Sequence, residues 1–270
     1  MSIIVLKIGG TEGVDFESIL DDVVTYWEQT PNLILVHGGS AEASALGERL
    51  GNPPRFITSP SGHTSRYTDR ATLEVFIMAV NGKINTLLVE GLRRRGVNAF
   101  GLSGLDGGLL QGTRKEAIQS VENGKRKIIR DDYSGKIEQV NAPLLRWLLE
   151  NGYLPVIAPL AVGRQGEALN VDADRVAAQI AVALGAKQLI LLTAAPGLLE
   201  RFPDESTLIR ALPFSQIARA QQAAQGRMKK KVLAAEEALS GGVPCVVIGD
   251  GRVTAPLRAA LDGQGTILHL

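Results

Sequence analysis

Short apolar segments alternate with amphipathic ones along most of the chain. The apolar segments are continuously hydrophobic, a pattern typical of parallel strands that are buried on both faces. The segments between them place apolar residues three or four positions apart, which predicts helices. We therefore expect an α/β fold, a three-layer α/β/α sandwich with a mainly parallel central sheet. The predicted strands are 3–8, 33–36, 99–102, 154–158, 189–193, 245–248 and 266–268, and the predicted helices are 16–29, 41–50, 69–95, 142–151, 173–184, 214–224, 229–240 and 254–261.

The region 109–140 breaks this alternation. It is polar, contains the turn dipeptides Asn123-Gly124 and Ser134-Gly135, and has only short β-like runs. Such turns favour β-hairpins, which we expect to project from the sandwich.

The predicted helix 69–95 is unusually long, at ~40 Å for a rise of 1.5 Å per residue. An apolar stripe runs along it from Leu73 to Leu92. It is either a core helix, broken at Asn81-Gly82, or a helix that packs partly on a second subunit, and the pattern favours neither.

Composition narrows the class of protein. The 270 residues carry a net charge of +1, and 45% are hydrophobic, which excludes general disorder and gives no electrostatic attraction to nucleic acid. Only 4% are aromatic, which argues against a base-stacking surface. One cysteine, Cys245, and three histidines leave no metal site to expect. No apolar run reaches ~18–20 residues and no signal-peptide pattern opens the chain, so we expect a cytoplasmic protein without a membrane span.

Glycines follow several predicted strands. Lys7-Ile8-Gly9-Gly10 ends the first strand, and His37-Gly38-Gly39-Ser40 ends the second. Glycine lets backbone N–H groups approach an anion, and a following helix N-terminus also favours negative charge. Because ligands of open α/β sheets bind at the carboxyl ends of the strands, these loops predict an anion site. The chain has neither a P-loop nor the G-x-G-x-x-G motif of dinucleotide-binding folds.

Charged residues at predicted helix starts add to this site. Asn170, Asp172 and Asp174 head one helix, and a helix cap explains only one of them. Lysines 229–231 begin another helix, where cations oppose the helix dipole, so at least one of them suggests a bound polyphosphate. Arg66, just before the predicted cap Asp69, could bind a carboxylate or form a surface ion pair.

Two further residues, His37 and Cys245, are of types that often act in catalysis, but their sequence surroundings do not indicate a catalytic role. His37 could be a general base, but no serine or cysteine lies with it in a nucleophile motif. Cys245 lies in an apolar strand and fits a core position.

These segments, in this order, resemble the amino acid kinase family. The motifs are K-x-G-G at 7–10, H-G-G at 37–39, R-x-T-D at 66–69, N-x-x-x-D at 170–174 and G-x-M-x-x-K at 226–231. They extend over nearly the whole chain and are most similar to the acetylglutamate-kinase-like branch. Within it, the stretches at 37–40, 101–107, 132–135 and 226–228 resemble the enzymes that act on an amino acid attached to a carrier protein in lysine biosynthesis.

The resemblance implies a role for individual residues. One kinase domain would span 1–270, with a substrate-binding and dimerisation lobe at 1–168 and a nucleotide-binding lobe at 169–270. The family pattern implies that Lys7 and Lys231 stabilise the transferred phosphoryl group and that Asp174 organises them. It implies that Gly38, Gly39, Ser40, Arg66 and Asn170 bind the substrate, and that Gly9, Gly10, Thr193, Gly197, Leu198 and Met228 contact the nucleotide.

The implied reaction uses ATP and Mg²⁺ to phosphorylate the side-chain carboxylate of carrier-linked 2-aminoadipate. A carboxylate is already ionised at pH 7, so no general base is needed, and no protein ligand to the metal is assigned. Ser40 and Arg227 replace glycines of acetylglutamate kinases, which argues against a free acetylated substrate. Kinases of N-acetylglutamate or of carrier-linked glutamate for arginine biosynthesis remain alternatives, as does a non-catalytic sensor on the same fold.

The resemblance also implies partners. The carrier of this branch (a LysW-like protein) is small and acidic, and a basic patch at 125–127 and Arg130 could bind it, unless that patch is an ordinary solvated hairpin. A homodimer is also expected.

Overall fold

An eight-stranded sheet forms the centre of the computed structural model, which describes residues 2–9, 16–58, 64–122 and 125–270. Its strand order is β14-β16-β15-β13-β1-β2-β10-β5, and every neighbouring pair is parallel except β15 and β16. All seven predicted strands are confirmed and lie in this sheet, and the eighth strand, β14, was not predicted. The strands are β1 (Ile4–Ile8), β2 (Leu33–His37), β5 (Ala99–Ser103), β10 (Leu154–Ala158), β13 (Gln188–Thr193), β14 (Ala211–Pro213), β15 (Cys245–Asp250) and β16 (Thr266–His269).

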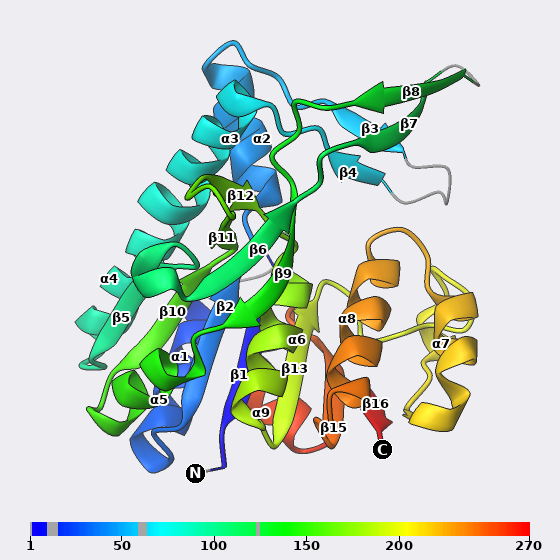
Figure 1. The fold of residues 1–270 in the computed structure, drawn as a ribbon. Helices are drawn as coiled ribbons and strands as arrows, with labels where there is room; N and C mark the ends of the chain where they lie inside the picture. Colours follow the sequence, from blue (N-terminus) through cyan, green and yellow to red (C-terminus); the bar gives the residue numbers. More distant parts are fainter. Residues whose placement is uncertain (1, 10–15, 59–63, 123–124) are drawn as a thin grey trace.

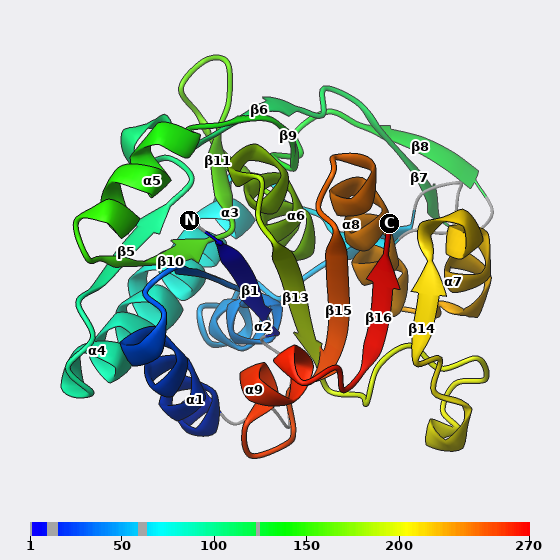
Figure 2. The same cartoon turned by 90° about the horizontal axis from the view of Figure 1, so that it is seen from below.

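Helices cover both faces of this sheet, which confirms the three-layer sandwich. Figure 2 shows α5, α6 and α8 on one face and α1, α4 and α9 on the other. The continuously apolar strands are buried between these layers, as their sequence predicts. The α-helices are α1 (Phe16–Gln29), α2 (Ser40–Arg49), α3 (Arg70–Ile77), α4 (Thr86–Arg94), α5 (Ala142–Glu150), α6 (Ala173–Leu184), α7 (Ile217–Ala223), α8 (Met228–Ser240) and α9 (Pro256–Leu261); the short 3₁₀ turns are η2 (Asp106–Gly108), η3 (Glu205–Thr207) and η4 (Phe214–Gln216).

The predicted long helix is continuous and is not broken at Asn81-Gly82. Instead, α3 and α4 are joined by a π-helical segment, η1 (Met78–Asn85). By length and hydropathy the 25-residue helix 70–94 could cross a membrane, but 44% of its most apolar window is buried inside the fold. That burial fits a helix that packs against the rest of this domain. Met78 and Leu87 of the same helix are half-exposed, so part of its apolar face is open to solvent.

Hairpins extend from the carboxyl end of the sheet, as predicted for 109–140 (Figure 1). The dipeptide Asn123-Gly124 lies outside the described residues. Ile57, Tyr67 and Ile129 form a small separate core that joins two of the hairpins. The strands of these smaller sheets are β3 (Phe56–Thr58) paired with β4 (Thr64–Arg66), β7 (Ile118–Glu122) paired with β8 (Lys125–Ile129), and the sheet β12-β11-β6-β9 made of β12 (Ala168–Asn170), β11 (Leu160–Val162), β6 (Leu110–Arg114) and β9 (Gly135–Val140).

Candidate active site

Two lysines and one aspartate, predicted from distant parts of the sequence, meet at the carboxyl end of the central strand. Lys7 comes from β1, Asp174 from the first turn of α6, and Lys231 from the first turn of α8. The Nζ atoms of Lys7 and Lys231 lie 2.8 and 2.9 Å from the same oxygen, Asp174 Oδ1. All three side chains are at least nine-tenths buried. The structure therefore joins the three residues expected to be catalytic.

This cluster buries two positive charges against one negative charge. Burial opposes ionisation of Asp174, but the two ammonium groups outweigh it and hold the pKa of that carboxyl well below its usual range. Burial, together with repulsion from Lys7, lowers the pKa of Lys231 to about 8, although Asp174 works against this shift. Burial also acts to lower the pKa of Lys7, but the attraction and the hydrogen bond from Asp174 outweigh burial. The net result is a pKa above the ordinary value of a lysine. The ionised cluster thus has an excess of one positive charge, which suits an anionic ligand.

The three polar residues at the start of α6, Asn170, Asp172 and Asp174, have different roles. Asp172 is the N-cap, and its Oδ1 accepts hydrogen bonds from the backbone N–H groups of Asp174 and Arg175 at 3.1 and 3.2 Å. The cap therefore accounts for Asp172 and leaves the side chains of Asn170 and Asp174 for other partners. Arg175 in turn forms a two-bond ion pair with Glu237 of α8, which ties together the two helices that supply Asp174 and Lys231.

The three consecutive lysines of α8 also differ from one another. Lys229 is exposed, and the half-exposed Lys230 pairs with Asp172 at 3.2 Å. Only Lys231 is buried. The ordinary interpretation of a lysine run, a solvated face, thus holds for the first two residues and not for the third.

Arg66 lies across from α2 and holds its first turn. Its Nη2 donates to the backbone carbonyl and the hydroxyl of Ser40 at 2.9 and 3.2 Å, and to Ser44 Oγ at 2.7 Å. The arginine is buried, and burial lowers its pKa. It is therefore not a surface ion pair, and it brings β4 against the glycine loop at 38–40 as the substrate-site hypothesis requires.

Asn170 joins the same group through Thr68, which the sequence interpretation did not single out. Asn170 Nδ2 donates to Thr68 Oγ1 at 3.0 Å, and Thr68 Oγ1 donates to the carbonyl of Arg66 at 3.1 Å. The fully buried Asp132 accepts the backbone N–H groups of Thr68 and Ser134 at 2.8 and 2.7 Å. The stretch 132–135 resembles the carrier-linked branch of the family. This resemblance was the signal from which the role of Asp132 in positioning Thr68 could have been predicted.

The residues predicted to contact the nucleotide have different surroundings. Gly9 follows β1 and is buried, while Gly10 lies outside the described residues. Thr193 ends β13 half-exposed, and Met228 begins α8 half-buried, so both remain candidates.

Leu198 stays a prediction for nucleotide contact, and in the structure it shapes the loop. Its side chain is buried in the core, and its N–H donates to Thr266 Oγ1 at 2.8 Å. Gly197 has a φ of 153°, and a Cβ there would lie 2.7 Å from both Leu208 and Thr266. The loop 193–199 therefore needs glycine for packing.

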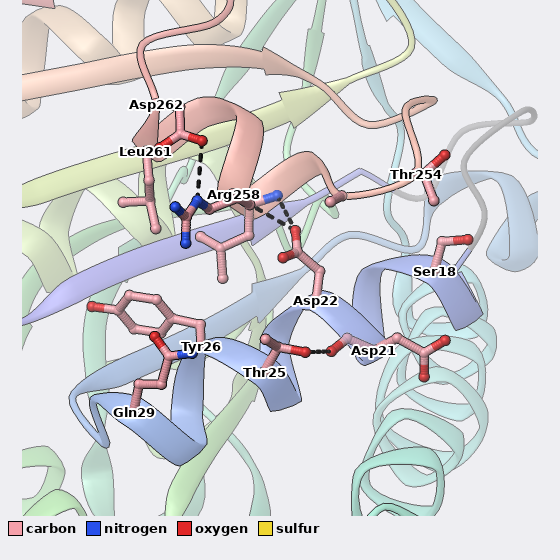
Figure 3. Close-up of a pocket in the computed structure, with 12 residues that line it drawn as sticks. Ser18, Asp21, Asp22, Thr25, Tyr26, Gln29, Thr254, Arg258, Leu261 and Asp262 are labelled. Carbon is pink, nitrogen blue, oxygen red and sulfur yellow. Dashed lines mark hydrogen bonds and ion pairs between the residues drawn. The ribbon is translucent and has the colours of Figure 1, made fainter.

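A pocket of about 470 Å³ lies elsewhere, between α1 and α9. Figure 3 shows Asp22 pointing at the N-terminus of α9, where it accepts the N–H groups of Leu257 and Arg258 at 2.6 and 3.0 Å. Burial raises the pKa of Asp22 in spite of these bonds. This carboxylate closes a helix end, and the pocket opens on the face of the sheet opposite to α6 and α8, so it is not the reaction site.

The mainly parallel sheet, with a glycine loop and a buried cluster of excess positive charge at its carboxyl end, has the architecture of an α/β protein and suits an anionic ligand. The model of the amino acid kinase family matches residues 2–249, and the chain belongs to that family. It is 52% identical to the [LysW]-aminoadipate kinase of Deinococcus radiodurans over 99% of this chain and 92% of that protein. It is 50% identical to the [LysW]-aminoadipate kinase of Thermus thermophilus over 98% of this chain and 100% of that protein.

A solved structure supports the fold. N-acetylglutamate synthase from Neisseria gonorrhoeae, complexed with coenzyme A and N-acetyl-glutamate, superposes with a TM-score of 0.81 over 100% of this chain and 59% of that one. At 24% identity this likeness shows the fold alone.

Proposed function

We propose that this protein transfers the γ-phosphoryl group of ATP to the side-chain carboxylate of 2-aminoadipate attached to a small acidic carrier protein, for lysine biosynthesis in the cytoplasm. The observation that carries the proposal is the buried cluster of Lys7, Asp174 and Lys231, with its excess positive charge at the carboxyl end of the sheet. The relatives that are half identical over nearly the whole chain supply the substrate class.

The chemistry needs charge stabilisation and alignment. A carboxylate oxygen attacks the γ-phosphorus, a new C–O–P linkage forms, and the bond from phosphorus to the bridging oxygen of ADP breaks. The attacking group is already an anion near neutral pH, so no proton has to move. Lys7 and Lys231 offset the repulsion between the two anions and stabilise the charge that builds up on the transferred group. Asp174 keeps both ammonium groups charged and pointing at one place.

His37 fits this scheme because it is not required as a base. It is fully buried, and burial, with a smaller contribution from nearby Lys7, lowers its pKa to about 4. The ring is therefore neutral near pH 7.

Magnesium is proposed as a companion of ATP. Among the described residues no group of three histidine, cysteine or carboxylate side chains could hold a metal ion. The part of the chain that the structure describes thus offers no such ligand set. Phosphate oxygens and water, which Mg²⁺ prefers, would have to supply its coordination.

The amino acid end of the substrate is assigned to Arg66, Ser40, Asn170 and the glycines at 38 and 39. Arg66 bonds to the Ser40 side chain, the residue that replaces a glycine of acetylglutamate kinases, and this contact supports a pocket entrance that differs from theirs. Aminoadipate and glutamate differ by one methylene, which is worth only ~1–3 kcal/mol in a pocket.

The test compares three acceptors at equal concentration: carrier-linked aminoadipate, carrier-linked glutamate and free N-acetylglutamate. ADP release and hydroxylamine trapping of the acyl phosphate are measured together. We expect the highest kcat/KM with carrier-linked aminoadipate. A preference for either of the other acceptors would assign the alternative kinase, and nucleotide binding without ADP release for any acceptor would support a sensor.

The carrier is proposed to dock on the β7–β8 hairpin. This hairpin projects at the same end of the sheet as the site (Figure 1). Lys127 and Arg130 are exposed there, beside the 58% exposed Ile128, and they offer positive charge and apolar surface to an acidic protein.

Charge reversal tests this docking surface. Lys127→Glu combined with Arg130→Glu should raise KM for the carrier-linked substrate about tenfold at low salt and leave KM for ATP within about twofold. Arg94→Glu is the matched control, because Arg94 is an exposed arginine in the last turn of α4, at the opposite end of the sheet. An unchanged KM in the double variant would place the docking surface elsewhere.

A homodimer is proposed through the free edge of β5. This strand ends the eight-stranded sheet, and Phe100, Tyr153 and Trp147 form an aromatic cluster beside it, with Phe100 43% and Trp147 55% exposed. A second copy would cover this edge and the open face of the long helix. Phe100→Glu with Trp147→Glu should give a monomer by light scattering, whereas a dimer that survives both changes would require another interface.

A further inference from the structure

A continuous chain of buried hydrogen bonds connects the long helix to the glycine loop after β2. Asn85, the last residue of η1, donates from Nδ2 to the backbone carbonyl of Val156 at 2.9 Å. The same Nδ2 lies 3.1 Å from His37 Nε2. His37 Nδ1 lies 2.8 Å from the carbonyl oxygen of Gly38. Asn85 is 5% exposed and His37 0%, so solvent does not compete for these bonds.

The direction of every bond in this chain follows from its two ends. Both ends are carbonyl oxygens, which only accept hydrogen bonds. Val156 therefore requires the amide nitrogen of Asn85, and that NH₂ group requires an acceptor at His37 Nε2. The proton of the neutral ring must then be on Nδ1, where it is donated to Gly38. A single tautomer of His37 satisfies all partners.

The bond to Gly38 sets the orientation of the next peptide plane. In a trans peptide the C=O and the following N–H point in opposite directions. Because the Gly38 carbonyl is held toward the buried ring, the N–H of Gly39 points away from that ring. Gly39 is the N-cap of α2, so this N–H lies at a helix N-terminus, which favours anions.

The π-helical segment η1 supplies both the side chains that pack on the glycine loop and the amide that bonds to His37. A Cβ on Gly39 would lie 2.7 Å from Val80 and 2.8 Å from Ile84, so the glycine loop packs directly on η1. A Cβ on Gly101 would collide with Asn85 Oδ1, so the glycine at 101 leaves room for the amide. Helical widening is frequent at functional sites, and here it brings an amide to the buried ring.

We propose that His37 and Asn85 are positioning residues, which act through the Gly38 carbonyl to aim the Gly39 N–H at the substrate or the transferred phosphoryl group. This inference rests on the proposed kinase function for its effect on rate. Its structural part, the tautomer and the bond to Gly38, does not depend on any substrate.

The first experiment is NMR of the full-length protein with ¹⁵N- and ¹³C-labelled histidine near pH 7.5. The chain has only three histidines, so His37 is assigned by comparison with the His37→Asn protein. We expect the neutral Nδ1–H tautomer. The Nε2–H tautomer or an imidazolium ring would overturn the inference, whether or not the protein turns over any acceptor.

The second experiment compares two variants that keep different halves of the ring. In His37→Asn the amide nitrogen occupies the position of Nδ1 and can still donate to Gly38. In His37→Gln the amide reaches the position of Nε2 and can bond only to Asn85. Asparagine is one methylene shorter than glutamine, so His37→Asn leaves the larger cavity and should lose more thermal stability than His37→Gln.

We expect kcat of His37→Gln to fall about 100-fold, the size of effect seen when one oriented donor is lost, with KM for ATP within about threefold. The kcat of His37→Asn should be at least tenfold higher than that of His37→Gln. Equal kcat values in the two variants would assign His37 to packing alone and overturn the proposal. If wild-type protein phosphorylates none of the acceptors, the proposed function fails, and the tautomer measurement alone decides this inference.

Discussion

Asp174→Asn is the change that most directly tests the proposed catalytic cluster. Asparagine keeps the size of the side chain but removes the negative charge shared by Lys7 and Lys231. Two buried ammonium groups would then face each other without the carboxylate that they share. Since breaking a buried ion pair costs ~3–5 kcal/mol, one lysine should release its proton instead. Lys231 is the one expected to do so, because its pKa is already lowered to about 8 by burial and by repulsion from Lys7.

The magnitude follows from that pKa. A pKa of about 8 leaves roughly three-quarters of the Lys231 side chains charged at pH 7.5 in the wild-type protein. A loss of ~3 kcal/mol lowers the pKa by about two units, so roughly 3% would stay charged in the variant. The loss of the Lys231 proton alone should then reduce kcat/KM for ATP about 25-fold at pH 7.5. At pH 6 about half of the variant should be charged again, so its activity relative to wild type should rise about tenfold.

The assay is kcat/KM for ATP at pH 6 and 7.5 for both proteins, because this parameter reports the free enzyme. Asp172→Asn is the matched control: it changes an aspartate in the same turn, asparagine still caps the helix, and the lost partner Lys230 is half-exposed. Its activity relative to wild type should not depend on pH. If the ratio for Asp174→Asn also stays constant between the two pH values, Asp174 does not hold the charge of the lysines and the reasoning fails.

Three further outcomes follow from the same geometry. In wild-type protein, kcat/KM for ATP should fall as pH rises through about 8, because the lowered pKa of Lys231 puts loss of its charge there; a flat profile up to pH 9 would contradict this. Lys231→Met should abolish turnover and raise Tm of the ATP-free protein by about 2–8 °C, because it removes the excess positive charge from the buried cluster. A Tm below that of wild type would show that this charge stabilises the fold. Arg66→Lys should raise KM for the carboxylate acceptor at least tenfold, with KM for ATP within about twofold. Nη2 of Arg66 alone bonds to both Ser40 and Ser44, and a lysine has no second nitrogen to bind the acceptor carboxylate beside those contacts.

The fold could be predicted from the sequence because its strands are buried on both faces. Continuously apolar runs flanked by amphipathic helices have few alternative arrangements, and α1 and α6 begin and end at the predicted residues. The short strands β3, β4, β11 and β12 were not predicted, because three residues are too few to show a period. The π-helical geometry at 78–85 was also missed, since the apolar stripe continues through it without interruption.

The site could be predicted only in part. The motifs named Lys7, Asp174 and Lys231, but nothing in their spacing says that two ammonium groups share one carboxylate oxygen. Thr68 and Asn85 were missed because their importance depends on partners far away in the sequence, 102 residues for Thr68 and Asn170 and 48 for Asn85 and His37. The burial of the Leu198 side chain was not predicted, because a loop position does not reveal which way a side chain points.

The arrangement of the site also explains why a protein would tolerate such a cluster. Burying two lysines against one aspartate lowers the stability of the ligand-free protein, and a core without the second lysine would be more stable. The first turn of α8 adds to the cost, because its dipole disfavours the cation at Lys231. Each unfavourable contribution becomes favourable when a polyphosphate enters, since the same N-terminus and the same excess charge then face an anion. The fold would therefore hold the ammonium groups in place before ATP arrives, so that little reorganisation remains to be done when the phosphoryl group moves.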